Sequence, residues 1–164
     1  MPEGPEIRIA ADKIERALSA LPTTGVFFAF DHLKPFEQDL TGCYVKGIET
    51  RGKAMLTHFD NGLSVYSHNQ LYGKWMVRKA LDYPETNRQL RFAIHNAKKS
   101  ALLYSASDIQ ILTEPEIETH PFLSQLGPDV LSKKLTAKQL QASLLSKKNH
   151  RRRLANLYLD QHFL

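Results

Sequence analysis

The sequence predicts an α+β fold that is mainly β: an antiparallel eight-stranded β-sandwich flanked by an N-terminal helix, with C-terminal helices. Three observations predict it. Apolar residues recur at helical spacing near the N-terminus, short runs rich in β-branched and aromatic residues fill the stretch from about residue 25 to 113, and helical spacing returns after residue 113. The 164 residues suit one domain with its own hydrophobic core.

A helix is expected from Glu3 to about Ala20. Its apolar residues lie three or four positions apart and so share one face: Ile7, Ala10, Ala11, Ile14, Leu18 and Leu21. Pro5 falls in the first turn, where its missing N–H costs nothing. Glu3 and Glu6 lie where the helix dipole favours acidic residues.

Short strands separated by turn residues are expected next. They are Val26–Phe30, Tyr44–Thr50, Lys53–Phe59, Leu63–His68, Lys74–Arg78, Leu90–His95, Ala101–Tyr104 and Ile109–Leu112. Asp60-Asn61-Gly62 is a strong hairpin signal, and residues 96–100 are typical of a second hairpin loop. Antiparallel strands at this spacing indicate a sandwich or a barrel.

The C-terminal part predicts two helices joined by a basic connector. Thr136-Ala137-Lys138-Gln139 matches a capping box, residues 147–153 are basic, and a second helix is expected from Leu154 to Leu164. That helix would end on Phe163-Leu164 with an unpartnered apolar face, which suggests the first part of a longer protein. The expected division is a catalytic domain over residues 1–130 and a basic helical segment over 131–164.

Positive charge is concentrated near the C-terminal end. The net charge is +5, but residues 131–164 hold eight Lys or Arg against one acid, while residues 1–130 hold 14 basic and 16 acidic residues. This asymmetry suggests a polyanionic partner. The alternative is an ordinary solvated helical face.

Several protein classes are excluded or disfavoured. No apolar run approaches the roughly 20 residues of a membrane span, and no basic-then-apolar signal segment opens the chain. Cys43 is the single cysteine, so it forms no internal disulfide and supplies no cysteine-rich zinc site. We therefore expect a cytoplasmic protein without a membrane partner or a metal.

The N-terminus carries the most specific chemical signal. Removal of Met1, which is common before a small residue, would expose Pro2 as a secondary amine, and a free α-amine has a pKa of about 7.7–8.0. Such an amine can attack an aldehyde-like carbon to form an iminium, and Glu3 could move protons beside it. The alternative is that Pro2 and Glu3 merely begin a helix.

Several motifs in order give the sequence a resemblance to a known family. They are Met1–Glu6, Glu49–Ala54, Tyr66–Gly73, Leu103–Asp108, His120–Leu123 and Gly127–Leu131. Over essentially the whole chain they resemble the Fpg/Nei family of DNA glycosylases with lyase activity, and within it the bacterial endonuclease VIII branch. The resemblance implies that Pro2 is the nucleophile on the sugar C1′, that Glu3 is the general acid at the ring oxygen, and that Lys53 acts at the phosphate and in elimination. Read alone, Lys53 would be an ordinary exposed lysine.

The same resemblance assigns Gln70, Leu71 and Tyr72 to a loop that fills the space left by an extruded base, which costs a few kcal/mol to unstack. Without it, Leu71 and Tyr72 would read as part of the sheet core. His68 is a candidate phosphate contact or a buried structural histidine. Arg151, Arg152 and Arg153, with Lys147 and Lys148, would face phosphates.

The family pattern also implies what the chain lacks. A helix–two-turn–helix module and a zinc finger usually follow, so the family's zinc is expected only in that missing region and no cofactor here. Gln125 stands where an arginine near DNA is typical, which puts a charged contact there in doubt. The implied partner is double-stranded DNA with an oxidised base, chiefly a pyrimidine, or an abasic site. We expect a monomer of the bacterial nucleoid, with weak DNA binding and little or no cleavage by these 164 residues alone.

Two other functions fit parts of the sequence. A non-catalytic nucleic-acid-binding module would bind DNA without a covalent adduct, and the joint presence of Pro2, Glu3 and Lys53 argues against it. An N-terminal-proline isomerase, with Pro2 as a base on a small keto acid, shares Pro2 alone with this chain.

Overall fold

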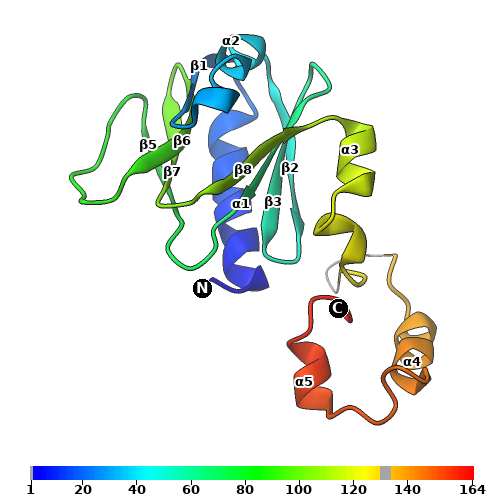
Figure 1. Ribbon diagram of the computed structural model, residues 1–164. Helices are drawn as coiled ribbons and strands as arrows, with labels where there is room; N and C mark the ends of the chain where they lie inside the picture. The colour runs from blue at the N-terminus through cyan, green and yellow to red at the C-terminus, as the bar shows by residue number, and fades with distance from the viewer. Residues whose placement is uncertain (1, 130–133) are drawn as a thin grey trace. The chain divides into compact units, whose positions relative to one another are not determined.

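The structure is a computed structural model that describes residues 2–129 and 134–164. The chain forms two compact units, Met1–Glu116 and Ile117–Leu164, which are described separately below (Figure 1). The division expected after residue 130 falls within the second unit, and residues 130–133, which include the end of the Gly127–Leu131 motif, lie outside the described residues.

The N-terminal helix α1 spans Gly4–Leu18. Its buried face consists of Ile7, Ala11, Ile14 and Leu18, as the apolar spacing predicts. Glu3 is the N-cap residue, and its carbonyl accepts the backbone N–H groups of Glu6 and Ile7 at 3.1 Å each. The helix ends two residues before the predicted Ala20, with Pro22 close behind.

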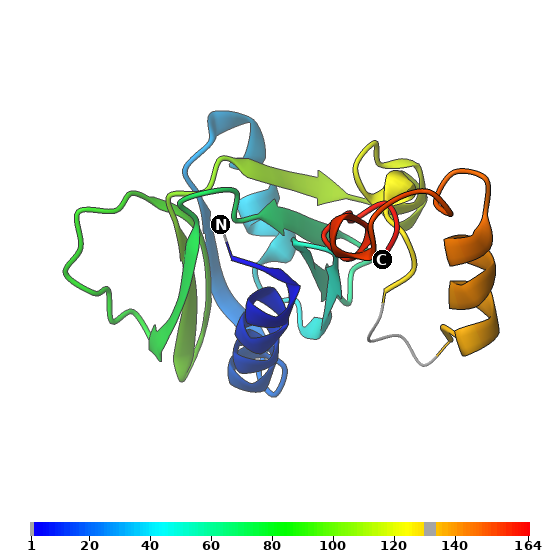
Figure 2. The same cartoon turned by 90° about the horizontal axis from the view of Figure 1, so that it is seen from below.

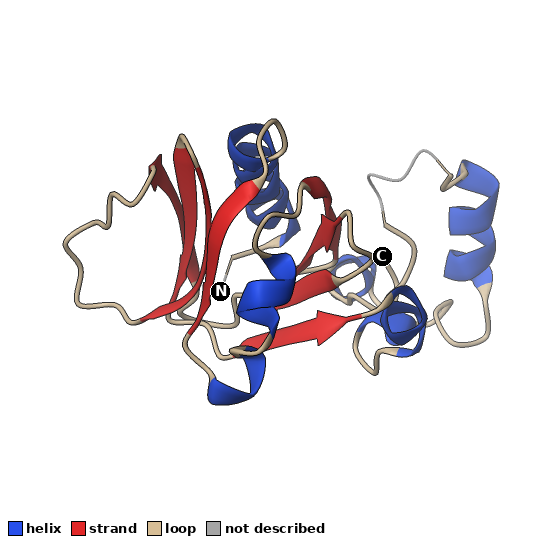
Figure 3. Ribbon diagram, turned by 90° about the horizontal axis from the view of Figure 1, so that it is seen from above, coloured by secondary structure: helices blue, strands red, loops and turns tan. Residues whose placement is uncertain are grey.

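Eight strands follow among the described residues, and each corresponds to a predicted run. They are β1 Thr23–Phe28, β2 Val45–Arg51, β3 Ala54–Phe59, β4 Ser64–His68, β5 Lys74–Lys79, β6 Leu90–Asn96, β7 Lys99–Tyr104 and β8 Asp108–Leu112. They form two four-stranded sheets, in the orders β1-β6-β7-β5 and β2-β3-β4-β8, with antiparallel pairing throughout (Figure 3). The predicted mainly β, α+β sandwich is confirmed.

Both predicted hairpins are present. Between β3 and β4, the Phe59 N–H donates to the Leu63 carbonyl at 2.9 Å, and the Asn61 side chain accepts the Leu63 N–H at 3.1 Å. Between β6 and β7, the Asn96 side chain accepts the N–H groups of Lys98 and Lys99. These side-chain bonds replace the ladder bonds that end at each turn.

The core of the first unit lies between the sheets and against α1. Ile48 and Val65 of one sheet and Ile94 and Leu103 of the other are all buried in the same cluster as the apolar face of the helix. Because α1 contacts β2 and β3 of one sheet and β5 and β7 of the other, it closes one side of the sandwich (Figure 2). The position of α1 therefore fixes where its N-terminal end lies.

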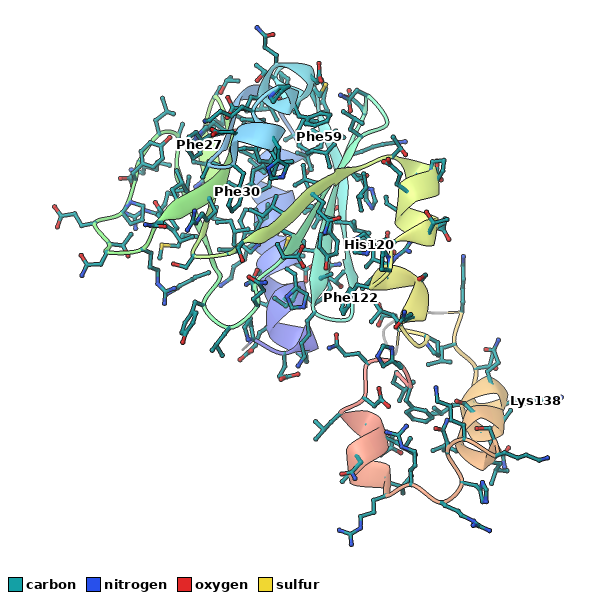
Figure 4. The ribbon with its side chains drawn as sticks, viewed as in Figure 1. Phe27, Phe30, Phe59, His120, Phe122 and Lys138 are labelled. Carbon is teal, nitrogen blue, oxygen red and sulfur yellow. The ribbon has the colours of Figure 1, made fainter. Side chains whose placement is uncertain are left out.

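Two short helices were not predicted in the first unit: the 3₁₀ helix η1 Asp31–Leu33 and the helix α2 Phe36–Leu40. Each is too short to show a helical period. They pack near the end of β1, where the Glu37 carboxylate accepts the Phe28 N–H at 2.8 Å. Figure 4 labels Phe27 and Phe30 in this region. Lys34 Nζ lies 5.2 Å from the centre of the Phe27 ring, and Arg91 Cζ lies 5.3 Å from the centre of the Phe30 ring.

The second unit holds short helices. They are the end of α3 Glu114–Thr119, the 3₁₀ helix η2 Leu123–Gln125, α4 Ala137–Leu145 and α5 Leu154–Tyr158. The predicted capping box of α4 is confirmed, since the Gln139 N–H donates to the Thr136 hydroxyl at 3.2 Å. Lys138 projects away from this helix in Figure 4. In the same view His120 lies beside Phe122, whose N–H donates to the His120 ring.

The prediction of one helix from Leu154 to Leu164 is wrong in its length, and the apolar face expected to lack a partner is partly buried. The helix stops at Tyr158, and the chain then turns so that the Gly127 N–H donates to the Gln161 carbonyl at 2.8 Å. A Cβ at Gly127 would lie 2.5 Å from the backbone of Phe163, so a glycine is required for this approach. Phe163 is buried, although Leu154 and Tyr158 of α5 stay exposed.

Within the described residues, no helix combines the length and the apolar character that a membrane crossing requires.

Candidate active site

The first turn of α1 lies beside the turn that joins β2 to β3. A Cβ built on Gly4 would be 3.8 Å from the Gly52 carbonyl oxygen, so the two backbones are neighbours. Further along the helix, Arg8 Nη1 donates to the Ile48 carbonyl at 3.2 Å, and the Ile48 N–H donates to Glu15 Oε1 at 3.1 Å. These bonds hold α1 along β2 in a fixed register.

Lys53 and Glu3 form an ion pair across this junction. Lys53 Nζ lies 2.9 Å from each oxygen of the Glu3 carboxylate, and 50 positions separate the two residues in the chain. Gly52 has φ +58°, the left-handed region that suits glycine, and this turn directs the following residue toward the helix end. The Lys53 side chain is 18% exposed, whereas that of Glu3 is 60% exposed.

Pro2 is half-buried directly before this pair. The Glu3 N–H donates to Glu6 Oε2 at 2.8 Å, so the peptide that joins Pro2 to the helix is held in place. The structure therefore brings the three predicted catalytic residues, Pro2, Glu3 and Lys53, to one place. Met1, whose removal the chemistry needs, lies outside the described residues.

His68 ends the middle strand β4 next to the same turn. It stands opposite Ala54 on one side and Asp108 on the other. Burial lowers the pKa of His68, the Asp108 carboxylate opposes that shift, and the Lys53 charge adds to it. The Gln70 N–H donates to Nδ1 at 2.9 Å, which places the proton of the neutral ring on Nε2.

The predicted loop Gln70–Tyr72 has exposed apolar tips. Leu71 is 55% exposed and Tyr72 69% exposed, which excludes the alternative that both belong to the sheet core. The loop is tight: the Gly73 N–H donates to the Asn69 carbonyl at 2.7 Å, and a Cβ at Gly73 would meet Asn69 at 2.4 Å. Figures 1 and 2 both show this loop, between β4 and β5, at the same end of the unit as the start of α1.

Some residues around these positions were not assigned a role from sequence. Asp108 accepts hydrogen bonds from Tyr66 Oη at 3.3 Å and from Gln110 Nε2 at 3.0 Å. Burial, and then the Asp108 charge, raises the pKa of Tyr66 above its usual range. Asp108 is the last residue of the Leu103–Asp108 motif. A single acidic residue after a turn does not indicate from sequence that it pairs with His68.

The predicted DNA contacts of the second unit differ in their surroundings. Gln125 is exposed, and its carbonyl accepts the His162 Nδ1–H at 2.8 Å. Arg151 and Arg153 are exposed, whereas Arg152 Nη2 lies 2.9 Å from Asp160. The His162 N–H and then Arg152 hold the pKa of Asp160 below its usual range. Arg152 is thus engaged within its own unit.

Over the described parts of the chain, 2–129 and 134–164, no group of three or more His, Cys, Asp and Glu side chains is arranged to hold a metal ion. The half-buried Cys43 Sγ instead donates to the Asp39 carbonyl at 3.3 Å. These residues do not fit a cysteine-rich zinc site.

Comparison with known proteins identifies the family. The family described as "Formamidopyrimidine-DNA glycosylase N-terminal domain" matches residues 1–107, about two thirds of the chain. The chain belongs to this family. The part that matches contains Pro2, Glu3, Lys53, His68 and the Gln70–Tyr72 loop.

Relatives in the family share much more of the sequence. The protein named Endonuclease 8 from Salmonella typhimurium strain LT2 is 56% identical over all 164 residues, and that from Salmonella paratyphi A is 55% identical. The chain spans 62% of the length of these relatives. The resemblance to the endonuclease VIII branch is confirmed.

Solved structures of the family have the same fold. Lactococcus lactis formamidopyrimidine-DNA glycosylase, non-covalently bound to DNA with an abasic site, has a TM-score of 0.78 with 16% identity, covering 99% of this chain and 64% of that one. MutM in complex with DNA containing carbocyclic 8-oxo-G has a TM-score of 0.70 with 16% identity, covering 87% and 57%. At this identity the likeness establishes the fold.

Proposed function

We propose that this chain is the N-terminal catalytic part of a base-excision-repair DNA glycosylase with AP lyase activity, acting on oxidised bases, chiefly pyrimidines. The observation that carries the proposal is the ion pair of Lys53 with Glu3 directly beside Pro2. An amine can form a Schiff base, a carboxyl group beside it can move protons, and an ammonium group can bind a phosphate. The names of the relatives and the DNA in the solved family structures support it.

The glycosylase step begins with the neutral amine of Pro2. Its lone pair forms a bond to the sugar C1′, the bond from C1′ to the base breaks, and the base departs with the bonding electrons and takes up a proton. The Glu3 carboxylate takes the proton that the amine nitrogen loses and then, as the acid, delivers it to the ring oxygen. The nitrogen lone pair forms the C=N bond as the C1′–O4′ bond opens. Because the proline nitrogen already has two carbon substituents, the resulting iminium carries a fixed positive charge.

The lyase step follows from that charge. The iminium acidifies the C2′ proton, its loss sends an electron pair toward the cation, and the C3′–O bond breaks to release the 3′ phosphate. A second elimination would release the 5′ phosphate and leave a one-nucleotide gap. Hydrolysis by water then regenerates the Pro2 amine.

Lys53 would act at the phosphate and hold the Glu3 carboxylate in position. Its ammonium group is mostly shielded from solvent, which strengthens its interaction with the Glu3 carboxylate and with an incoming phosphate. The partner is double-stranded DNA with an oxidised base or an abasic site, bound by a monomer.

Reductive trapping tests the proposal. Sodium borohydride should reduce the iminium and link the chain irreversibly to an oligonucleotide with an abasic site, and Pro2→Gly should reduce or abolish that product. Intact mass spectrometry must first establish that Met1 is removed. Because weak DNA binding is expected, the oligonucleotide is raised until binding saturates, and a chain that has lost Met1 and still stays unlinked would contradict the proposal.

A non-catalytic nucleic-acid-binding module is the second candidate. The exposed Arg151 and Arg153 in a segment with a net charge of +7 favour it. It predicts salt-sensitive binding without any trapped product, so the same experiment separates the two.

A further inference from the structure

The side chain of Gln70 is oriented by Ser107. Gln70 Oε1 accepts the Ser107 hydroxyl at 2.7 Å and the Ser107 N–H at 3.3 Å. A backbone N–H can only donate, so the oxygen of this amide faces Ser107 and the NH₂ group faces away. Gln70 itself has φ +53°, and its N–H donates to His68. The backbone and the side chain of Gln70 are therefore both fixed.

The other end of the loop is held by Arg88. Its Nη1 donates to the Tyr72 carbonyl at 2.6 Å, from the long segment between β5 and β6. That segment is itself attached to the sheet: the Tyr83 hydroxyl lies 3.1 Å from His95 Nε2, and the Leu81 N–H donates to the Ser100 hydroxyl at 2.9 Å. Arg88 thus links the exposed loop to a segment that is hydrogen-bonded to the sheet.

These contacts surround side chains that pack on little else. Leu71 and Tyr72 expose more than half of their surface, and surface loops are usually more mobile than the elements that they connect. Side chains that insert into a base stack are most effective on an ordered backbone, because ordering a flexible loop on binding costs free energy.

We propose that Ser107 and Arg88 are positioning residues for the Gln70–Tyr72 loop, and that Ser107 sets Gln70 to donate hydrogen bonds from its NH₂ group to acceptor atoms of a nucleobase. This inference rests on the proposed function and adds to it two positioning residues and the orientation of the Gln70 amide. The ligand class is the base left unpaired opposite an extruded nucleotide, which presents ring-nitrogen or carbonyl acceptors.

The test compares borohydride trapping of the chain on a duplex and on a single strand that carries the same abasic site. A single strand has no stack to enter, so it reports the Pro2 chemistry alone. Ser107→Ala and Arg88→Met should each lower the duplex-to-single-strand ratio of trapping rates about two- to tenfold, the range of one lost hydrogen bond. Ser107→Thr, which keeps the hydroxyl, should restore the ratio.

Matched controls lie at the far end of α1, roughly 20 Å from its start by the rise of a helix. Ser19 and Arg16 are exposed there, and Ser19→Ala and Arg16→Met should leave the ratio unchanged. Gln70→Glu still accepts from Ser107 but cannot donate, so it should lower the ratio while the melting temperature stays the same.

The outcomes separate the two proposals. If the wild-type chain traps neither substrate, the proposed function fails and this inference falls with it. If it traps both and the Ser107 and Arg88 variants keep the wild-type ratio, or if it traps single strands but no duplex, this inference alone is overturned. A salt dependence flattened by Arg88→Met would overturn the positioning role too, because it would mark a phosphate contact.

Discussion

The ion pair of Lys53 with Glu3 links residues that the sequence separates by 50 positions. Gly52, with φ +58°, turns the hairpin, and this turn lies beside the start of the helix. Pro2, Glu3 and Lys53 could be named from the sequence as candidate catalytic residues, and their roles stay a prediction. Their contact distances could not be predicted, since these depend on the register of α1 on β2.

Replacing Lys53 with methionine keeps the stem and removes the charge. We expect the rate of borohydride trapping to fall at least about a hundredfold, at the low end of the range for losing a positioned acid–base group. Trapping rates on a single-stranded abasic oligonucleotide measure this. Lys46→Met, at an exposed position of β2 away from the turn that carries Lys53, is the control and should behave like the wild type. Equal rates for the two variants would contradict the role of Lys53.

The lowered pKa of Glu49 predicts that the fold loses stability in acid. The hydrogen bond from His58 lowers the pKa of Glu49 most. Burial raises this pKa, the hydrogen bond from Arg51 lowers it further, and the result is about 2. In the unfolded chain the carboxyl group has its ordinary pKa near 4.3, so the unfolded state binds the proton first as pH falls. The stability that Glu49 contributes is thus full above about pH 4.3 and is lost toward about pH 2.

Unfolding free energy measured from pH 5 to 2 checks this. Glu49→Gln has no carboxyl group, and its free energy of unfolding should fall less steeply with acid than that of the wild type. Parallel curves would show that the His58 and Arg51 contacts do not hold the Glu49 charge.

Elements differ in how far sequence could predict them. The strands were predicted because alternating patterns and turn residues are local signals. The short helices η1 and α2 were missed because five residues or fewer carry no period. The last helix was extended too far because its end depends on the approach of Phe163 to Gly127, a contact between residues 36 positions apart that no local pattern encodes.

The tight loop between β4 and β5 yields a prediction at this scale. Gly73→Ala would place a methyl group 2.4 Å from the Asn69 backbone, so we expect a loss of about 1–3 kcal/mol in unfolding free energy. Denaturant titration measures it. Gly25→Ala meets His95 at an ordinary 3.9 Å and serves as the control. A Gly73 variant as stable as the control would show that the loop relaxes freely.

Across the whole molecule, positive charge is concentrated in residues 131–164, and the structure separates paired from exposed basic residues there. The C-terminal excess of basic residues does not act uniformly, since Arg152 is bound to Asp160 while Arg151 and Arg153 face solvent. Sequence could count these charges but could not sort them, because the turn after α5 that brings Asp160 back to Arg152 was not predicted.

This sorting predicts different effects for neighbouring arginines. Arg151→Ala should lower the slope of log affinity against log salt by about 1, with an unchanged melting temperature. Arg152→Ala should instead lower the melting temperature, because Asp160 loses the Arg152 guanidinium and keeps only the His162 N–H. Filter binding of duplex DNA over a range of salt concentrations and thermal melting separate these effects, and identical behaviour of the two variants would refute the assignment.

The helix cap at Glu3 has a practical consequence for anyone who studies this protein. Since α1 begins at Gly4 and takes its first hydrogen bonds from Glu3, the fold does not depend on a free amine at Pro2. A purification tag fused ahead of Pro2 would therefore leave this helix intact and turn the Pro2 nitrogen into an amide. Under the proposed function such a preparation would be folded and yet form no Schiff base, so a C-terminal tag is the suitable choice.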